Sequence, residues 1–230
     1  MKYRILDHLS KKIEGEEVFR IQAIKDFSDV TCDTLGGYIS SEYNLSQEGD
    51  CWVYGEAIVR GRATVRKDAK VMDHATLFDW SSISDNAVMS DHSNASDNAM
   101  IYGNAKMFGW SRAYNNSEVF GDAVLKDQVR VFLDAWVYGE LEVSGKAYVS
   151  GKCTKTPVVL MGLPYVVTIM DDELSFDCQA KLSQEWLSIT NQELMLMDKA
   201  KAVRFYNKYW KIIKPIAEMH QKTEYTNRGG

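Results

Sequence analysis

The chain has 230 residues, a net charge of −5 at pH 7 and a hydrophobic content of 45%. This length accommodates one elongated domain with terminal additions, or at most two domains. The acidic balance argues against sequence-independent nucleic-acid binding, and the lack of a long apolar run argues against a membrane span. Residues 1–9 are too charged for a signal peptide, so we expect a cytoplasmic protein.

The cysteines Cys32, Cys51, Cys153 and Cys178 lack the spacing of metal ligands. In a reducing compartment they are expected to be free thiols. We therefore assign no metal site to them.

Residues 1–52 are expected to form an N-terminal β cap. Residues 3–6 and 18–24 are rich in β-branched and aromatic side chains, and they flank a turn-like Glu-Gly-Glu sequence. This pattern predicts a small antiparallel strand pair. Gly36 and Gly37 then lie in an irregular connection that leads to Trp52. A cap is needed here because the first strands of a coil would otherwise expose unpaired edges.

Residues 53–154 form a repeat of six residues without interruption, which gives seventeen units. First positions are aliphatic, fifth positions are mostly Ala, Ser or Cys, and third positions are mostly Gly or Asp. Two inward positions in every six residues, separated by a turn former, do not fit a helix of 3.6 residues per turn. They fit short strands on three flat faces, so that one coil takes eighteen residues. The predicted architecture is mainly β, a three-sided parallel β-helix.

The volumes of the inward side chains support a coil with three sides. Met89, Ala95 and Ile101 fall in one layer of a three-sided coil, and Met107 and Ala113 fall together in the next. In each layer a large Met is paired with a small Ala, as a close-packed core requires.

These motifs are similar to those of the hexapeptide-repeat superfamily, whose members fold as left-handed parallel β-helices. Residues 35–39 (L-G-G-Y-I), 44–46 (N-L-S) and 49–54 (G-D-C-W-V-Y) further resemble a group of bacterial and phage proteins with V-Y-G-N-A units. The resemblance implies a left-handed coil. It implies no single activity, because the superfamily contains acyltransferases, carbonic anhydrases and proteins without known chemistry.

Outward positions in the repeat form stripes, since side chains eighteen residues apart stack. Tyr102, Phe120 and Tyr138 form one aromatic stripe, and we expect it to bind a partner. A second stripe is expected from Tyr114 and Phe132, with Trp136 nearby.

Asp occupies five consecutive third positions, Asp73, Asp79, Asp85, Asp91 and Asp97. Asp tolerates turn geometry by bonding to its own backbone, so turn formation is the first explanation. A calcium site between Asp73 and Asp91 is the alternative, although calcium needs six or more oxygen ligands and no others are evident. We assign no metal.

Residues 155–230 are expected to form strands and a long helix that packs on the coil. Strands are predicted over 158–160 and 165–170, and helices start at Ser183 and at Thr190, where Thr190 and Glu193 form a capping box. Pro215 should kink or divide the second helix. We expect this helix to cover one of the aromatic stripes.

His74 and His92 are the candidate catalytic residues. They are eighteen residues apart, each follows an Asp, and Trp110 is next in line, so the three rings should stack on one outer face. Resemblance to the superfamily's acyltransferases implies a general-base histidine, with Trp110 against acetyl-coenzyme A as co-substrate. Two histidines do not supply the three ligands of a catalytic zinc, which argues against carbonic anhydrase chemistry.

The uninterrupted repeat leaves no loop to close a catalytic site. We therefore expect a non-catalytic binding or scaffold protein without a cofactor, which presents flat faces to a protein partner in a phage or host-defence setting. The alternative is an acyl-coenzyme A-dependent acetyltransferase. The flat faces also favour a homotrimer or dimer.

Overall fold

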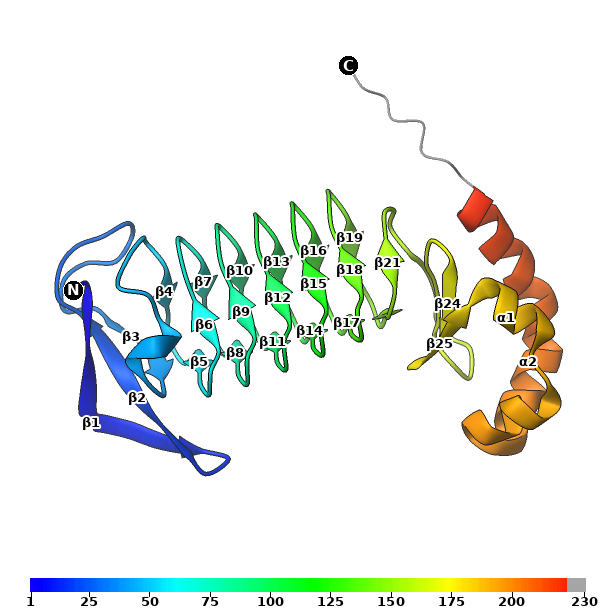
Figure 1. Cartoon of the computed structure of the whole chain (residues 1–230), viewed down its shortest axis with the longest axis horizontal. Helices are drawn as coiled ribbons and strands as arrows, with labels where there is room; N and C mark the ends of the chain where they lie inside the picture. The colour runs from blue at the N-terminus through cyan, green and yellow to red at the C-terminus, as the bar shows by residue number, and fades with distance from the viewer. Residues whose placement is uncertain (223–230) are drawn as a thin grey trace, which may run out of the picture.

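The computed structural model describes residues 1–222, and most of them form a coil of short parallel strands (Figure 1). The strands lie in three sheets that run along the coil. The long sheet contains, in order, β1 (Tyr3–Ile13), β2 (Glu16–Ala23), β3 (Leu35–Ile39), β5 (Ile58–Val59), β8 (Thr76–Leu77), β11 (Asn94–Ala95), β14 (Arg112–Ala113), β17 (Arg130–Val131) and β20 (Tyr148–Val149).

The other two sheets of the coil have six strands each. The second sheet contains β4 (Trp52–Val53), β7 (Lys70–Val71), β10 (Val88–Met89), β13 (Lys106–Met107), β16 (Val124–Leu125) and β19 (Glu142–Val143). The third sheet contains β6 (Thr64–Val65), β9 (Ser82–Ile83), β12 (Met100–Ile101), β15 (Glu118–Val119), β18 (Trp136–Val137) and β21 (Lys152–Cys153).

The register of the strands confirms the three-sided parallel β-helix. Met89 pairs with Met107, and Ala95 pairs with Ala113, so partners are eighteen residues apart. Every first and fifth position of the repeat from 53 to 153 is buried. Because these side chains are aliphatic or small, the coil has a continuous apolar core.

The corners of the coil explain the Gly and Asp residues at third positions. From Gly55 to Gly145 every third position has a φ between 55° and 76°, a region that costs Gly, Asn and Asp least. The Asp side chains bond to the next coil rather than to their own backbone as we expected. Asp73 Oδ2 accepts the N–H of Asp91 at 3.1 Å, and Asp91 Oδ2 accepts that of Gly109 at 2.9 Å.

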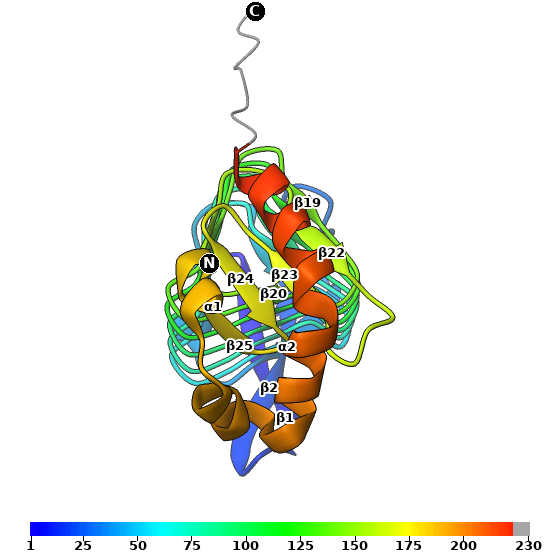
Figure 2. The same cartoon turned by 90° about the vertical axis from the view of Figure 1, so that its right-hand side faces the viewer.

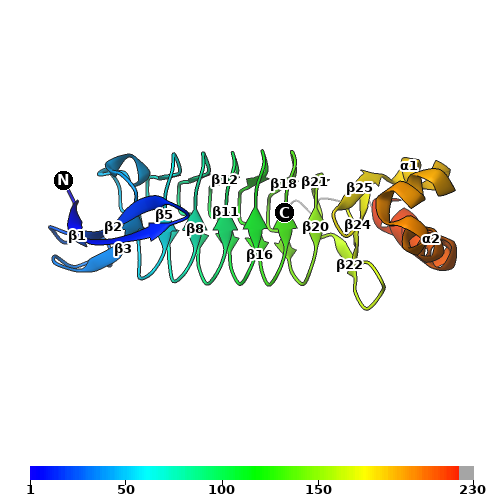
Figure 3. The same ribbon diagram turned by 90° about the horizontal axis from the view of Figure 1, so that it is seen from below.

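The N-terminal cap is the predicted antiparallel pair, β1 with β2, and it extends the long sheet (Figure 3). Coil-like pairing starts before Val53, within the segment expected to form the cap. Ile39 pairs in parallel with Val59, and Leu45 forms a bridge with Val65 after the short helix η1 (Glu42–Asn44). These partners are twenty residues apart instead of eighteen, so two extra residues hide this coil from a strict six-residue count.

The C-terminal unit begins with four antiparallel strands, the terminal sheet. They are β22 (Val158–Leu160), β23 (Val167–Ile169), β24 (Glu173–Phe176) and β25 (Gln179–Leu182). The sheet closes the last coil: Ser175 Oγ donates to the carbonyl oxygen of Tyr148, and Met170 joins the coil core. Helices α1 (Ser183–Ser188) and α2 (Asn191–Lys222) cover the sheet's other side at the end of the molecule (Figure 2).

Two expectations for the last helix are wrong. Helix α2 does not cover the stripe of Tyr102, Phe120 and Tyr138. It packs instead on the terminal sheet, whose buried side chains form a separate core with Leu194 and Phe205. The helix is also divided at Asp198 and Lys199, which have non-helical dihedral angles, whereas Pro215, expected to kink or divide it, lies within the continuous part.

The capping box at the start of α2 is confirmed. Glu193 Oε2 accepts the N–H of Thr190 at 2.8 Å, and Thr190 Oγ1 accepts the N–H of Glu193 at 3.2 Å. No helix in residues 1–222 has the length and hydropathy required to cross a bilayer.

Candidate binding face

The outer surface of the long sheet, here called the long face, carries three rows of side chains along the coil. Each row takes one side chain per eighteen residues, because successive strands stack in register. The corner row consists of Glu56, His74, His92, Trp110 and Gln128. The central row consists of Ile58, Thr76, Asn94, Arg112, Arg130 and Tyr148. The aromatic row consists of Arg60, Phe78, Ser96, Tyr114 and Phe132.

The corner row stacks His74, His92 and Trp110 as the sequence spacing predicts. The centroids of His74 and His92 are 5.1 Å apart with planes 6° from parallel, and those of His92 and Trp110 are 4.2 Å apart at 13°. Within residues 1–222 no side chain bonds to either imidazole, since Asp73 and Asp91 use their carboxylates on backbone N–H groups. The stack therefore lacks a group that orients a general base.

Two unpaired arginines dominate the central row. Arg112 lies directly opposite Arg130 in the parallel register of β14 and β17. Neither forms an ion pair with an acidic residue in the described part of the chain, and Arg130 lies 5.3 Å from the centroid of the Tyr148 ring. Like charges directly opposite each other are unfavourable in a sheet, so this pair is an uncompensated positive centre.

Two open hollows flank the arginine pair. One has a volume of about 270 Å³ and is lined by Trp110, Arg112, Gln128 and Arg130. The other has a volume of about 320 Å³ and is lined by Phe78, Asn94, Ser96, Arg112, Tyr114 and Arg130. No carboxylate lines either hollow. Burial raises the pKa of Tyr114, and the charges of Arg130 and Arg112 oppose that shift.

The predicted partner-binding stripe lies on a different corner, where the chain leaves the third sheet. Tyr102 and Phe120 stack at 4.9 Å and 2°, and Phe120 and Tyr138 stack at 5.1 Å and 7°. All three rings are half-buried without cover from α2. Tyr102 donates to Glu118 Oε2 at 2.7 Å, and burial together with this carboxylate raises the pKa of Tyr102 to about 12.

The second stripe is confirmed in part. Tyr114 and Phe132 stack at 5.5 Å and 11° on the long face. The inclusion of Trp136 is wrong, because Trp136 belongs to β18 on the third sheet. An outward residue at the sixth position of a unit projects from a strand, whereas one at the second position follows the strand toward the corner.

Metal ligands do not gather in residues 1–222, where no three His, Cys, Asp or Glu side chains come together. The stacked Asp73 and Asp91 serve the backbone of the next coil, as described above. All four cysteines are free, with Cys51 and Cys153 buried and the other two exposed.

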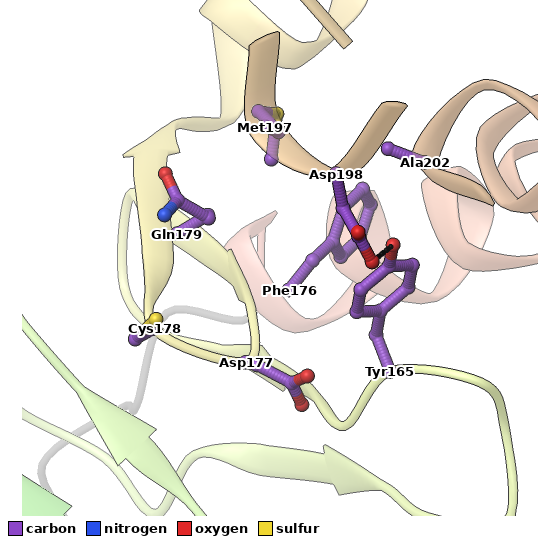
Figure 4. A pocket seen from close by; sticks show the side chains of 8 residues that line it. All are labelled: Tyr165, Phe176, Asp177, Cys178, Gln179, Met197, Asp198 and Ala202. Atoms are coloured by element: carbon purple, nitrogen blue, oxygen red, sulfur yellow. Dashed lines mark hydrogen bonds between the residues drawn. The ribbon is translucent and has the colours of Figure 1, made fainter. Parts of the chain in front are cut away.

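A third cavity, of about 170 Å³, lies in the C-terminal unit (Figure 4). Phe176, Met197 and Ala202 supply apolar lining, and Tyr165 donates to Asp198 Oδ2 at 2.5 Å. That bond, followed by one from Lys201, lowers the pKa of Asp198. Asp198 is where α2 breaks, so the bond from Tyr165 ties this break to the terminal sheet unit.

The fold and the long face define a parallel β-helix protein with its polar groups on outer faces rather than in a closed pocket. No family model matches the chain. Over 47 residues, 20% of its length, the chain is 49% identical to a protein of Escherichia coli (strain K12) named "Uncharacterized acetyltransferase YdcK". The matched segment covers 14% of that protein, so the similarity is local.

Sequence reasoning placed the His74, His92 and Trp110 stack but missed the arginine pair. The signal was present, because Arg112 and Arg130 are eighteen residues apart, as are the two histidines.

Proposed function

We propose that this protein is a non-catalytic binding protein whose long face holds an anionic group of a macromolecular partner. The observation that carries the proposal is the in-register pair of Arg112 and Arg130, which has no carboxylate partner in residues 1–222. Each guanidinium presents five N–H donors in a planar fork that suits carboxylate, phosphate or sulfate groups. The phage or host-defence setting expected from the resemblance belongs to this proposal.

The shape of the long face supports binding rather than catalysis. Both hollows are open, and small-molecule catalysis ordinarily requires a pocket that excludes water. The rings of the corner row and of the aromatic row, on either side of the arginines, add apolar contact area next to the charge. A large partner can bury such a surface without a lid.

The test measures the binding of polyglutamate, dextran sulfate and inorganic pyrophosphate by titration calorimetry at low salt. Replacing Arg112 and Arg130 together by Gln should weaken binding at least tenfold, since a charge-assisted hydrogen bond contributes about 1.5 to 3 kcal/mol. Added salt should weaken binding to the unaltered protein.

The matched control removes two positive charges elsewhere, by Lys12→Gln with Lys106→Gln. Both lysines are exposed and lie away from the hollows. Equal losses in the two double variants would show that net charge alone governs binding and would contradict the proposal.

Acetyl transfer is the second candidate, favoured by the local similarity to a protein named as an acetyltransferase. In that function His92 would act as the general base, with His74 stacked on it, and Trp110 and the arginines would contact acetyl-coenzyme A. The assay follows release of the coenzyme A thiol in the presence of amine and hydroxyl acceptors. Thiol release that is lost in His92→Ala, with the fold intact, would establish this candidate over the binding proposal.

A further inference from the structure

The aromatic row of the long face has a planar group in every coil from Arg60 to Phe132 except one. The Arg60 guanidinium lies 4.7 Å from the centroid of the Phe78 ring, and the Tyr114 and Phe132 rings lie 5.5 Å apart. Between these two stacked pairs the row holds Ser96, whose side chain is too short to fill the level. The row is therefore a stack of planar groups with one per coil, and the coil of Ser96 is its one vacant level.

The height of that level suits one planar ring. Neighbouring strands in a sheet are about 4.8 Å apart, so Phe78 and Tyr114, two coils apart, have rings separated by about 10 Å. Aromatic pairs prefer centroid distances of about 4.5 to 7 Å, and a ring placed midway satisfies this range on both sides. The hollow of about 320 Å³ occupies this level and is lined by both rings.

The remaining lining of the hollow indicates what the ring carries. Arg112 and Arg130 form one wall and offer unpaired guanidinium groups to an anion. Asn94 Nδ2 donates one N–H to Thr76 Oγ1 at 2.7 Å, which leaves the amide oxygen as an acceptor and the second N–H as a donor for a ligand. A planar ring with hydrogen-bonding groups on its edge and a phosphate group combines all three features.

We propose that the vacant level between Phe78 and Tyr114 binds a nucleoside phosphate, with the base between the two rings and the phosphates on Arg112 and Arg130. This inference rests on the anion-binding role proposed for Arg112 and Arg130, and it assigns a free nucleoside phosphate, rather than a group of a macromolecule, to that pair. The binding contributions differ in kind: the rings stack on the base, and the guanidinium groups recognise the phosphates.

The test fills the level with a side chain. Ser96→Phe adds the missing ring, and phenylalanine already occupies this position in the coils of Phe78 and Phe132, so the variant should fold. ADP should bind about tenfold or more weakly to Ser96→Phe, because stacking on an aromatic ring is the interaction lost. Inorganic pyrophosphate, which has no ring, should bind the variant and the unaltered protein equally.

Ser90→Phe is the matched control. Ser90 occupies the same second position of a unit, between Met72 and Phe108 on another corner. ADP binding should be unchanged in this variant. If Ser96→Phe does not fold, Tyr114→Ala replaces it and should weaken ADP but not pyrophosphate.

The outcomes separate this inference from the proposed function. Equal ADP and pyrophosphate affinity that Ser96→Phe leaves unchanged would overturn the nucleotide site and leave anion binding intact. Binding of neither ligand would overturn both. Competition between ADP and coenzyme A would support the site, because both ligands contain a nucleoside phosphate. The tighter binder of the two would indicate whether the natural ligand is a free nucleotide or a coenzyme A. Coenzyme A binding without ADP binding would contradict the site.

Discussion

At the scale of single residues, the corners of the coil show which side chains cost folding free energy in a left-handed backbone conformation. Leu133 has a φ of 59° and is 51% exposed, while the corner one coil earlier carries Asn115 with the same φ of 59°. A left-handed conformation costs a branched residue about 1 to 2 kcal/mol, and Asn much less. The exposed leucine gains little burial in return.

Leu133→Asn should therefore stabilise the protein by about 1 kcal/mol. The measurement is chemical denaturation, followed by circular dichroism. Leu133→Ala is the control, because alanine removes the exposed side chain but keeps the backbone strain, and it should give no gain. A gain as large with alanine as with asparagine would show that exposure, rather than backbone conformation, is the cause.

Tyr102 gives a prediction about pH. Its pKa is raised to about 12 by burial and by the carboxylate of Glu118, so the folded state favours the protonated phenol. The stability gained in this way is complete below the ordinary pKa of about 10 and is lost as the pH rises toward 12. The stability of the unaltered protein relative to Tyr102→Phe should fall over that interval.

The measurement is the difference in tyrosinate absorbance between the unaltered protein and Tyr102→Phe during a pH titration. Its midpoint should lie near 12. In Glu118→Gln the same phenol should titrate at lower pH, because the carboxylate that accepts its hydrogen bond is gone. A midpoint that does not move in Glu118→Gln would argue against this role of Glu118.

At the scale of the strands, the repeat predicts that a large side chain cannot enter a fifth position. Ala105 is fully buried between β12 and β13. Ala105→Leu should overpack the core and cost about 1 to 3 kcal/mol. The next residue, Lys106, points outward and is exposed, so Lys106→Leu should change the denaturation midpoint little. Equal costs in the two variants would contradict the inward and outward assignment.

The strands of the coil could be predicted because each of them needs only local information. Val53 to Cys153 repeat one turn chemistry and one burial pattern, so every unit supports the interpretation of the next. The coil before Val53 was missed because two additional residues break the count, although Ile39 and Leu45 still point inward. A strict period is a sufficient sign of a coil but not a necessary one.

The destination of α2 could not be predicted from its own sequence. Its apolar face needs a partner, and both the aromatic stripe and the terminal sheet meet that need. Strands β24 and β25, which sequence reasoning did not identify, complete the sheet that α2 covers. In the same way, the vacant level at Ser96 depends on three coils at once and is invisible in any single unit.

At the scale of the whole molecule, the expected homotrimer or dimer stays a prediction. The third sheet exposes 41% of Met100 and 43% of Trp136 on its outer surface, and the stripe of Tyr102, Phe120 and Tyr138 runs beside them. Such an apolar surface favours association with a second copy. Sedimentation at several concentrations should show an oligomer that Trp136→Glu dissociates. A monomer at every concentration would contradict this prediction.

The separation of the two cores predicts how the molecule unfolds. One core runs through the coil, and the other lies between the terminal sheet and α2. Hydrogen bonds join them, among them those from Ser175 to Tyr148, from Ser150 to Glu173 and from the Tyr148 N–H to Thr168. In a repeat protein each unit depends mainly on its neighbours, so a terminal unit with a core of its own can unfold before the rest.

Calorimetry should therefore resolve two thermal transitions, with the C-terminal unit first. Trp186 is fully buried in the smaller core and donates to the carbonyl oxygen of Leu174 at 2.7 Å. Trp186→Ala should lower only the first transition, by a loss of about 3 to 5 kcal/mol, whereas Ala105→Leu should lower only the second. If either variant shifts both transitions together, the two cores form one cooperative unit. In that event the closing contacts of the terminal sheet couple the end of the molecule to the long face.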